Sequence, residues 1–208
     1  SLVAWQALRS RVDAPLIVYS KQNIVKRLPP PFAQIRRAAY RRATAAWAVG
    51  ETTAATLRAT GFQRPVHVVP HGAEVSRFLP GRDDVRRGEL GLSGVVVGFV
   101  GRLVSEKGVR DLLAALTLLA DRGVTGCSLC FVGGGPLAHE VKRAGREGAL
   151  AGRVRLVGPV VHDDAPRQYQ LFDVLALPSR TTPRWREQFG RVLVEAAATG
   201  LPLVGSDS

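Results

Sequence analysis

The sequence of 208 residues has no methionine, two cysteines and no long apolar run. Because a natural reading frame normally begins with methionine, whereas this one begins SLVAWQALR, we expect an internal piece of a longer protein. Two cysteines are too few for a disulfide framework. No run approaches the roughly 18 apolar residues of a membrane helix, and no signal-peptide pattern opens the chain. A cytoplasmic protein is therefore expected.

The two cysteines form a C-x-x-C pattern, which can indicate a redox or metal site. Cys127 and Cys130, however, lie in or beside the apolar run SLCFVG, which is typical of a buried strand. Residues three apart on a strand point to opposite faces of the sheet. We therefore interpret both as core residues.

Positive charge dominates the chain, with a formal net charge of +12, and it is concentrated before residue 50. The basic residues crowded between residues 21 and 42 are Lys21, Lys26, Arg27, Arg36, Arg37, Arg41 and Arg42. Such a face can meet anionic lipid headgroups, phosphorylated substrates or nucleic acid. It can equally be the solvated side of a helix whose other side carries Phe32, Ile35 and Ala39. Nucleic acid is not expected, because no helix-turn-helix, zinc-finger or aromatic RNA-binding signature is present.

Short apolar runs alternate with helical patterns along the chain. The strand-like runs are 15–20, 45–49, 66–70, 95–101, 128–133, 154–158, 173–179 and 201–206. Helical periodicity appears near 32–43, 51–60, 109–121, 136–147, 165–171 and 190–199. This alternation predicts an α/β fold with parallel sheets covered on both faces.

The segment from His71 to Gly94 carries no apolar strand and is the natural joint between two domains. We predict that residues 1–78 are the C-terminal part of one Rossmann-like domain. Residues 79–94 are the predicted linker. Residues 95–208 are predicted to form most of a second such domain, truncated at its end.

Ligands of open α/β sheets bind at the carboxyl ends of the strands, so the turns after the strands are the places to search. The first such turn, GRLVSEKG, places Arg102 and Lys107 before a helix that starts near Gly108. Two cations beside a helix N-terminus can bind a diphosphate and stabilise its charge as it departs. The alternative is a pair of solvated loop charges with Glu106 as a local partner. No Walker motif is present.

The second turn, FVGGGPLAHE, formally meets the relaxed dinucleotide pattern G-x-G-x-x-A through Gly133, Gly135 and Ala138. The next strand lacks the acidic residue that would hold an adenosine ribose, so nicotinamide and flavin cofactors are not expected. Pro136 is interpreted as the first residue of the following helix. The glycines can still let a nucleotide approach closely.

The third turn, VGPVVHDDAP, offers backbone and apolar surface near Val160 that suit a flat base. His162 in this turn and His71 in the joint are interpreted as loop residues. The fourth turn contains Glu187 and opens a helix at Gly190, with Glu195 inside it. Two carboxylates around a helix N-terminus can hold a polyhydroxylated anion such as a nucleotide-sugar. For Glu195, a plain ion pair with Arg191 is the alternative.

The ordered motifs GRLVSEKG, FVGGGP, LVGPV, FDVLALPS and EQFGRVLVEAAATGLPLVGSD resemble the donor-binding domain of retaining GT-B glycosyltransferases of family 4. The segment VVPHGAEVSRFLPG resembles that family's linker, and the similarity covers essentially the whole chain. The resemblance implies a GT-B fold with two Rossmann-like domains, both incomplete in this chain.

The resemblance also implies roles for individual residues. Arg102 and Lys107 would bind the donor diphosphate and Glu187 the transferred sugar, which makes these three the expected catalytic residues. Glu195 would bind the ribose. The expected donor-binding set is Gly101, Gly134, Val160, Phe189, Gly190, Arg191 and Glu195.

The implied reaction moves a sugar from a UDP- or GDP-sugar to a glycan, lipid-linked precursor or small molecule, with retention of configuration. No metal and no cofactor are expected, because two cations and a helix N-terminus can neutralise the diphosphate. We expect this piece alone to be inactive, and contact of its basic part with anionic membrane at the inner face is a further expectation. The alternatives are a nucleotide-sugar epimerase of GT-B fold and a non-catalytic basic module that binds membrane or nucleic acid.

Overall fold

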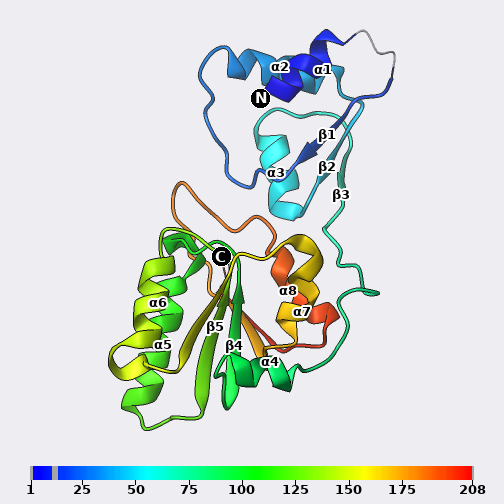
Figure 1. Ribbon diagram of the computed structural model, residues 1–208. Helices are drawn as coiled ribbons and strands as arrows, with labels where there is room; N and C mark the ends of the chain where they lie inside the picture. The colour runs from blue at the N-terminus through cyan, green and yellow to red at the C-terminus, as the bar shows by residue number, and fades with distance from the viewer. Residues whose placement is uncertain (1, 11–13, 208) are drawn as a thin grey trace. The chain divides into compact units, whose positions relative to one another are not determined.

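The computed structural model describes residues 2–10 and 14–207 (Figure 1). The chain divides into two compact units, one ending at His71 and one beginning at Gly72. The predicted linker, 79–94, lies inside the second unit and contains helix α4 (Asp84–Glu89). Buried Arg87 of this helix donates hydrogen bonds of 3.0 and 2.9 Å to the two carboxylate oxygens of Asp173. This contact between distant residues, which no local pattern reveals, ties the segment to the second unit.

The first unit has a parallel sheet in the order β1-β2-β3. Its strands are β1 (Ile17–Ser20), β2 (Ala45–Ala48) and β3 (Val66–Val68), and its helices are α1 (Leu2–Arg9), α2 (Phe32–Arg42) and α3 (Glu51–Ala59). Ala46 and Ala48 of β2 pack with Leu57 of α3 and with Phe62 in a small apolar core. Ala39 is buried as predicted for the apolar side of α2, but Phe32 is 47% exposed.

The second unit has a parallel sheet of five strands in the order β6-β5-β4-β7-β8. The strands are β4 (Val95–Val100), β5 (Cys127–Val132), β6 (Val154–Gly158), β7 (Val174–Leu177) and β8 (Leu203–Gly205). The longer helices are α5 (Val109–Asp121), α6 (Ala138–Arg146) and α8 (Arg191–Ala198), and α7 (Ala165–Tyr169) is short. The 3-10 turns are η1 (Ser105–Lys107), η2 (Gly148–Leu150) and η3 (His162–Asp164).

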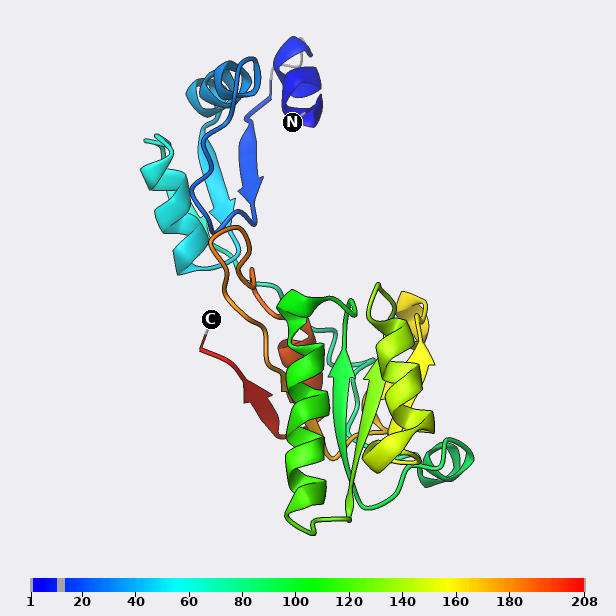
Figure 2. The ribbon, with the colours of Figure 1, turned by 90° about the vertical axis from the view of Figure 1, so that its left-hand side faces the viewer.

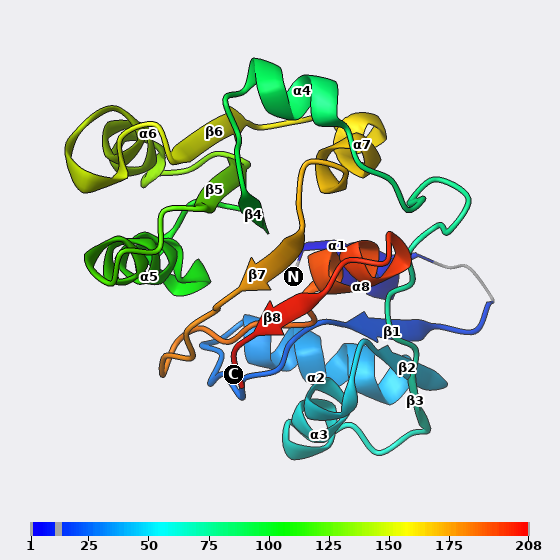
Figure 3. The ribbon, with the colours of Figure 1, turned by 90° about the horizontal axis from the view of Figure 1, so that it is seen from below.

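Helices cover both faces of this second sheet. Figure 2 shows α5 and α6 over one face, and Figure 3 shows α4, α7 and α8 on the other side. Each face has its own apolar cluster, and the two free cysteines divide between them, with Cys127 in one and Cys130 in the other. Burial raises the pKa of the Cys130 thiol to about 12. The interpretation of both as core residues is confirmed.

The predicted α/β class with parallel sheets is confirmed, and all eight predicted strands are present. Two helices, α1 and α4, were not predicted. The charged sequence of α4 has little apolar periodicity, but the Asp83 carboxylate accepts a hydrogen bond from the Arg86 amide and caps the helix. None of the helices in the described part of the chain is both long and apolar enough to cross a membrane.

The start of α6 differs from the prediction. The helix begins at Ala138 and not at Pro136. The amide of Leu137 donates a 3.0 Å hydrogen bond to the Leu103 carbonyl, and the Leu137 side chain is buried. Residues 135–137 are therefore held against the turn that follows β4, and helical geometry starts only after them.

Close packing at Gly98 in β4 generates a prediction about stability. A Cβ atom at this position would lie 2.2 Å from the ring of buried Phe172. We expect Gly98→Ala to lower the free energy of unfolding by about 1–3 kcal/mol through overpacking. Urea denaturation of the variant measures this loss. Gly126→Ala is the control, because its Cβ would meet no heavy atom within 4 Å, and an equal loss in both variants would contradict the packing explanation.

Candidate functional site

The strand order reverses between β4 and β7, because the chain continues to β5 and β6 on one side and β7 and β8 occupy the other. In open parallel sheets such a reversal separates the helices that follow the two strands and leaves a crevice at the carboxyl ends. The turns after β4 and β7 carry Arg102, Lys107 and Glu187. All three residues expected to be catalytic therefore follow the two strands at this reversal point.

The turn after β4 packs tightly against the turn after β7. Gly108 precedes α5 with φ of 71°, in the left-handed region. A Cβ atom at this position would lie 2.0 Å from the carbonyl oxygen of Pro178. The amide of Arg180 also donates a 2.8 Å hydrogen bond to the Glu106 carbonyl. Glycine at residue 108 thus allows the two turns to meet.

Lys107 and Glu187 form an ion pair between these two turns, with 20% and 17% of the respective side chains exposed. The hydroxyl of Ser179 donates a 2.8 Å hydrogen bond to the same Glu187 oxygen, and the Lys107 ammonium lies 5.6 Å from the centre of the Trp185 ring. The local alternative, with Glu106 as the partner of Lys107, is therefore wrong. Glu187, which had no obvious partner in the sequence, has a specific one.

This environment determines the charge of Glu187. Burial alone would raise the pKa of its carboxyl group, but the hydrogen bond and charge of Lys107, helped by Ser179 and the backbone of Gln188, lower the pKa below its usual value. A carboxylate that stays ionised is an acceptor for the hydroxyl groups of a polyol.

Arg102 has a different environment from Lys107. Its side chain is exposed, and it makes no ion pair with any carboxylate in the described part of the chain. The amide of Gly101, the preceding residue, donates a 2.9 Å hydrogen bond to the Val132 carbonyl and so joins the ends of β4 and β5. The guanidinium of Arg102 is thus available to an anion at the end of the sheet.

The glycine-rich turn after β5 packs against the turn after β4. Cβ atoms at Gly133 and Gly135 would lie 1.9 Å from the carbonyl oxygen of Gly101 and 2.6 Å from that of Leu103. These two glycines therefore serve the packing of one turn on another. A Cβ at Gly134 would make only an ordinary contact with Pro159, at 3.8 Å, so this position has room for a side chain.

Val160 follows β6 and lines a pocket of about 500 Å³. The other lining residues are Asp83, Arg86, Pro159, Val161, Asp164, Arg167 and Gln168. Arg86 donates a 2.9 Å hydrogen bond to the side chain of buried Gln168. This hydrogen bond holds the two side chains together on the polar side of the pocket. His162 lies in η3 with an exposed side chain, as interpreted from the sequence. His71, in the other unit, is hydrogen-bonded to Tyr19 at 3.3 Å.

Helix α8 begins after Gly190, which has φ of 70° as its N-terminal cap, as predicted. Arg191 donates a 2.8 Å hydrogen bond to Oε1 of Glu195, so the ion pair considered as an alternative is present. Glu195 is nevertheless 5% exposed, and its Oε2 accepts a 2.6 Å hydrogen bond from the hydroxyl of Tyr169. Phe189, just before the helix, is partly buried.

Ser179, Trp185 and Tyr169 were not identified from the sequence. Ser179 lies two residues after the end of β7, so the search of strand ends had a signal that could have found it. Trp185 is an aromatic residue in a polar loop. Tyr169 had no such signal, because it lies on a different helix and reaches Glu195 only in the folded chain.

Within residues 2–10 and 14–207, no three side chains of the types His, Cys, Asp and Glu come together as ligands for a metal ion. The potential ligands for an anion are the two cations after β4, the backbone at the start of α8 and the turn after β5. Together they define an α/β protein with a site suited to a phosphorylated, hydroxyl-rich ligand.

Comparison with known proteins gives the family. The family described as glycosyl transferases group 1 matches residues 94–208, more than half of the chain, and the chain belongs to this family. A solved Anabaena HepE structure in complex with UDP and glucose has a TM-score of 0.73 at 23% identity, over 93% of this chain and 53% of that one. Sucrose-phosphate synthase from Thermosynechococcus elongatus has a TM-score of 0.72 at 23% identity, over 99% of this chain and 53% of that one. The predicted GT-B type of fold is confirmed.

Two relatives by sequence are transferases. The 2-deoxystreptamine glucosyltransferase of Streptomyces kanamyceticus is 33% identical over 90% of this chain and 49% of its own length. A GDP-mannose-dependent alpha-(1-6)-phosphatidylinositol monomannoside mannosyltransferase of Mycobacterium tuberculosis is 34% identical over 72% of this chain and 40% of its own length. The chain thus spans half or less of the length of these relatives.

The lowered pKa of Glu187 predicts a pH dependence of stability. A carboxylate with a lowered pKa in the folded state stabilises the fold above its unfolded pKa of about 4.3, and this contribution is lost as pH falls through the folded pKa. We expect Glu187→Gln to reduce the fall in unfolding free energy on acidification. Urea denaturation from neutral pH to about pH 3 measures the slope. A slope in Glu187→Gln equal to that of the wild type would exclude this role.

Proposed function

We propose that this chain carries the donor site of an enzyme that transfers a sugar from a nucleotide-diphosphate sugar to an acceptor with retention of configuration. The main support is the pair of carboxylates, Glu187 and Glu195, on either side of the start of α8, together with the ion pair that joins Glu187 to Lys107. One carboxylate suits the sugar hydroxyls and the other suits the ribose hydroxyls. The helix N-terminus and the cations suit the diphosphate between them.

In this mechanism Arg102 and Lys107 stabilise the negative charge that grows on the leaving diphosphate. Glu187 holds the transferred sugar, and its contact with Lys107 keeps the sugar-binding carboxylate beside the cation that meets the phosphate. We propose departure and attack on the same face of the sugar, assisted by the leaving phosphate. The two cations and the helix N-terminus take the role that a metal ion would otherwise have.

The remaining donor-site residues have supporting parts in this proposal. Val160 and its pocket suit the base. For Gly101, Gly134, Phe189 and Gly190, which follow strands or precede α8, we propose backbone contacts with the phosphates. Both of the two relatives described above are transferases, which favours transfer over the epimerase alternative. Since the chain spans half or less of their length, we propose that it binds donor by itself but has little or no transferase activity.

Nucleotide binding tests the donor site. We expect UDP or GDP to raise the melting temperature of the 208-residue chain, because a ligand that binds only the folded state stabilises it by about 2.7 kcal/mol at 100 times Kd. Arg102→Ala and Glu195→Ala should each remove most of this shift, whereas Glu89→Ala should keep it. Differential scanning fluorimetry reports these shifts. No shift with any of UDP, GDP and ADP in the wild type would contradict the proposed donor site.

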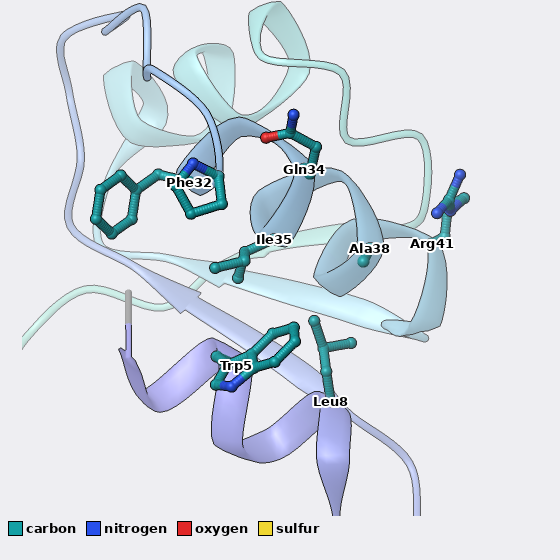
Figure 4. A pocket seen from close by; sticks show the side chains of 8 residues that line it. Trp5, Leu8, Phe32, Gln34, Ile35, Ala38 and Arg41 are labelled. Carbon is teal, nitrogen blue, oxygen red and sulfur yellow. The ribbon is translucent and has the colours of Figure 1, made fainter.

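The first unit supports a second proposal, that the protein works at the inner face of an anionic membrane. Figure 4 shows an apolar pocket between α1 and α2, about 560 Å³ in volume, with Trp5 and Leu8 facing Ile35 and Ala38. Arg41 lines it as well, and no Asp or Glu occurs from residue 14 to residue 50. Apolar side chains flanked by cations suit the headgroup region of an anionic bilayer.

Vesicle sedimentation tests the membrane proposal. We expect the chain to sediment with vesicles of phosphatidylcholine and phosphatidylglycerol but not with phosphatidylcholine alone. Arg41→Ala should bind about fivefold more weakly, because a cation near the surface contributes about 1 kcal/mol. Arg143→Ala, which removes one arginine from α6, is the charge-matched control. Equal losses in the two variants would show a non-specific charge effect and overturn the proposed surface.

A further inference from the structure

Tyr169 is a fully buried tyrosine whose hydroxyl points at a carboxylate of the proposed site. It ends helix α7, has 0% of its surface exposed, and donates a 2.6 Å hydrogen bond to Oε2 of Glu195 on α8. Its ring lies edge-on to Phe78 and Phe172, with centroids at 5.6 and 6.1 Å. The apolar cluster on this face of the sheet therefore fixes the position of the hydroxyl.

The direction of this hydrogen bond is determined by chemistry. The hydroxyl of Tyr169 donates this hydrogen bond, and the carboxylate oxygen Oε2 of Glu195 accepts it. Burial, and then the hydrogen bond and charge of Glu195, raise the pKa of Tyr169 well above its usual value. The hydroxyl therefore remains a donor throughout the neutral range.

Oε1, the other oxygen of Glu195, has its partner on the solvent side. Arg191, with 53% of its side chain exposed, donates a 2.8 Å hydrogen bond to Oε1. The two oxygens thus have one partner in the core and one partner near the solvent. Since each carboxylate oxygen has two lone-pair positions, both oxygens keep one position for a further donor.

We propose that Tyr169 is a positioning residue for nucleotide binding: its buried hydroxyl holds the Glu195 carboxylate in the orientation that accepts the ribose hydroxyls of the donor. This inference rests on the proposed role of Glu195. The side chain of glutamate has three rotatable bonds, and a single exposed arginine leaves several of its rotamers open. The tyrosine restricts them before the ligand arrives, so less entropy is lost on binding.

Tyr169→Phe tests this role, because it keeps the ring in contact with Phe78 and Phe172 and removes only the hydroxyl. We expect UDP or GDP to bind the variant about tenfold more weakly, equivalent to about 1.4 kcal/mol, in calorimetric titration. In a Glu195→Ala background the same change should have no further effect on affinity. Tyr40→Phe is the matched control, since its hydroxyl is within 3.1 Å of the Thr60 hydroxyl in the other unit.

Glu195→Gln keeps the test valid if Tyr169→Phe alone does not fold. The neutral amide leaves no buried charge without its donor, and its carbonyl oxygen can still accept from Tyr169. We expect the double variant Tyr169→Phe and Glu195→Gln to bind nucleotide more weakly than Glu195→Gln alone. Equal affinities of these two proteins would overturn the positioning role.

The outcomes separate this inference from the proposed function. If Glu195→Ala weakens nucleotide binding and Tyr169→Phe binds like the wild type, the donor site stands and the role of Tyr169 is overturned. If Glu195→Ala binds like the wild type, the ribose assignment itself fails, and the role of Tyr169 fails with it. Loss of affinity in Tyr169→Phe with full affinity in Tyr40→Phe supports the inference.

Discussion

The ion pair between Lys107 and Glu187 joins the two turns at the point where the strand order of the second sheet reverses. It exists because β4 and β7 are neighbours, although the two residues are 80 positions apart in the chain. Gly108 lets the turns approach closely enough, and Ser179 adds a donor to the same carboxylate. The charge of the proposed sugar-binding residue and the closed packing of the two turns both depend on this contact.

In the proposed donor site, some side chains are held by contacts with other side chains, whereas one makes no ion pair among the described residues. Lys107 and Glu187 hold each other, and Glu195 is held by Tyr169 and Arg191. Groups fixed before a ligand arrives lose little conformational entropy on binding. Arg102, in contrast, makes no ion pair among the described residues and can adjust to an anion. This division suits a ligand whose sugar and ribose must be oriented, while its diphosphate gains charge during the reaction.

Most elements of the fold could be predicted from local patterns. Apolar runs and helical periodicity indicated the eight strands and six of the helices, because side-chain periodicity reflects which face of an element is buried. Helix α4 was not predicted, because it has no apolar stripe. A polar cap at Asp83 and the contact of Arg87 with Asp173 hold it in place instead. The same contact places the segment expected to be a linker inside the second unit.

The sequence by itself determined the order of strands and helices, the glycine turns before α5 and α8, and the opposite faces of Cys127 and Cys130. It also indicated which cations and carboxylates belong to the proposed site. The tertiary structure alone decided their partners: Lys107 pairs with distant Glu187 and not with adjacent Glu106, and Tyr169 reaches Glu195. Local periodicity depends on nearest neighbours along the chain, whereas these contacts depend on strand order and on helix packing across the sheet.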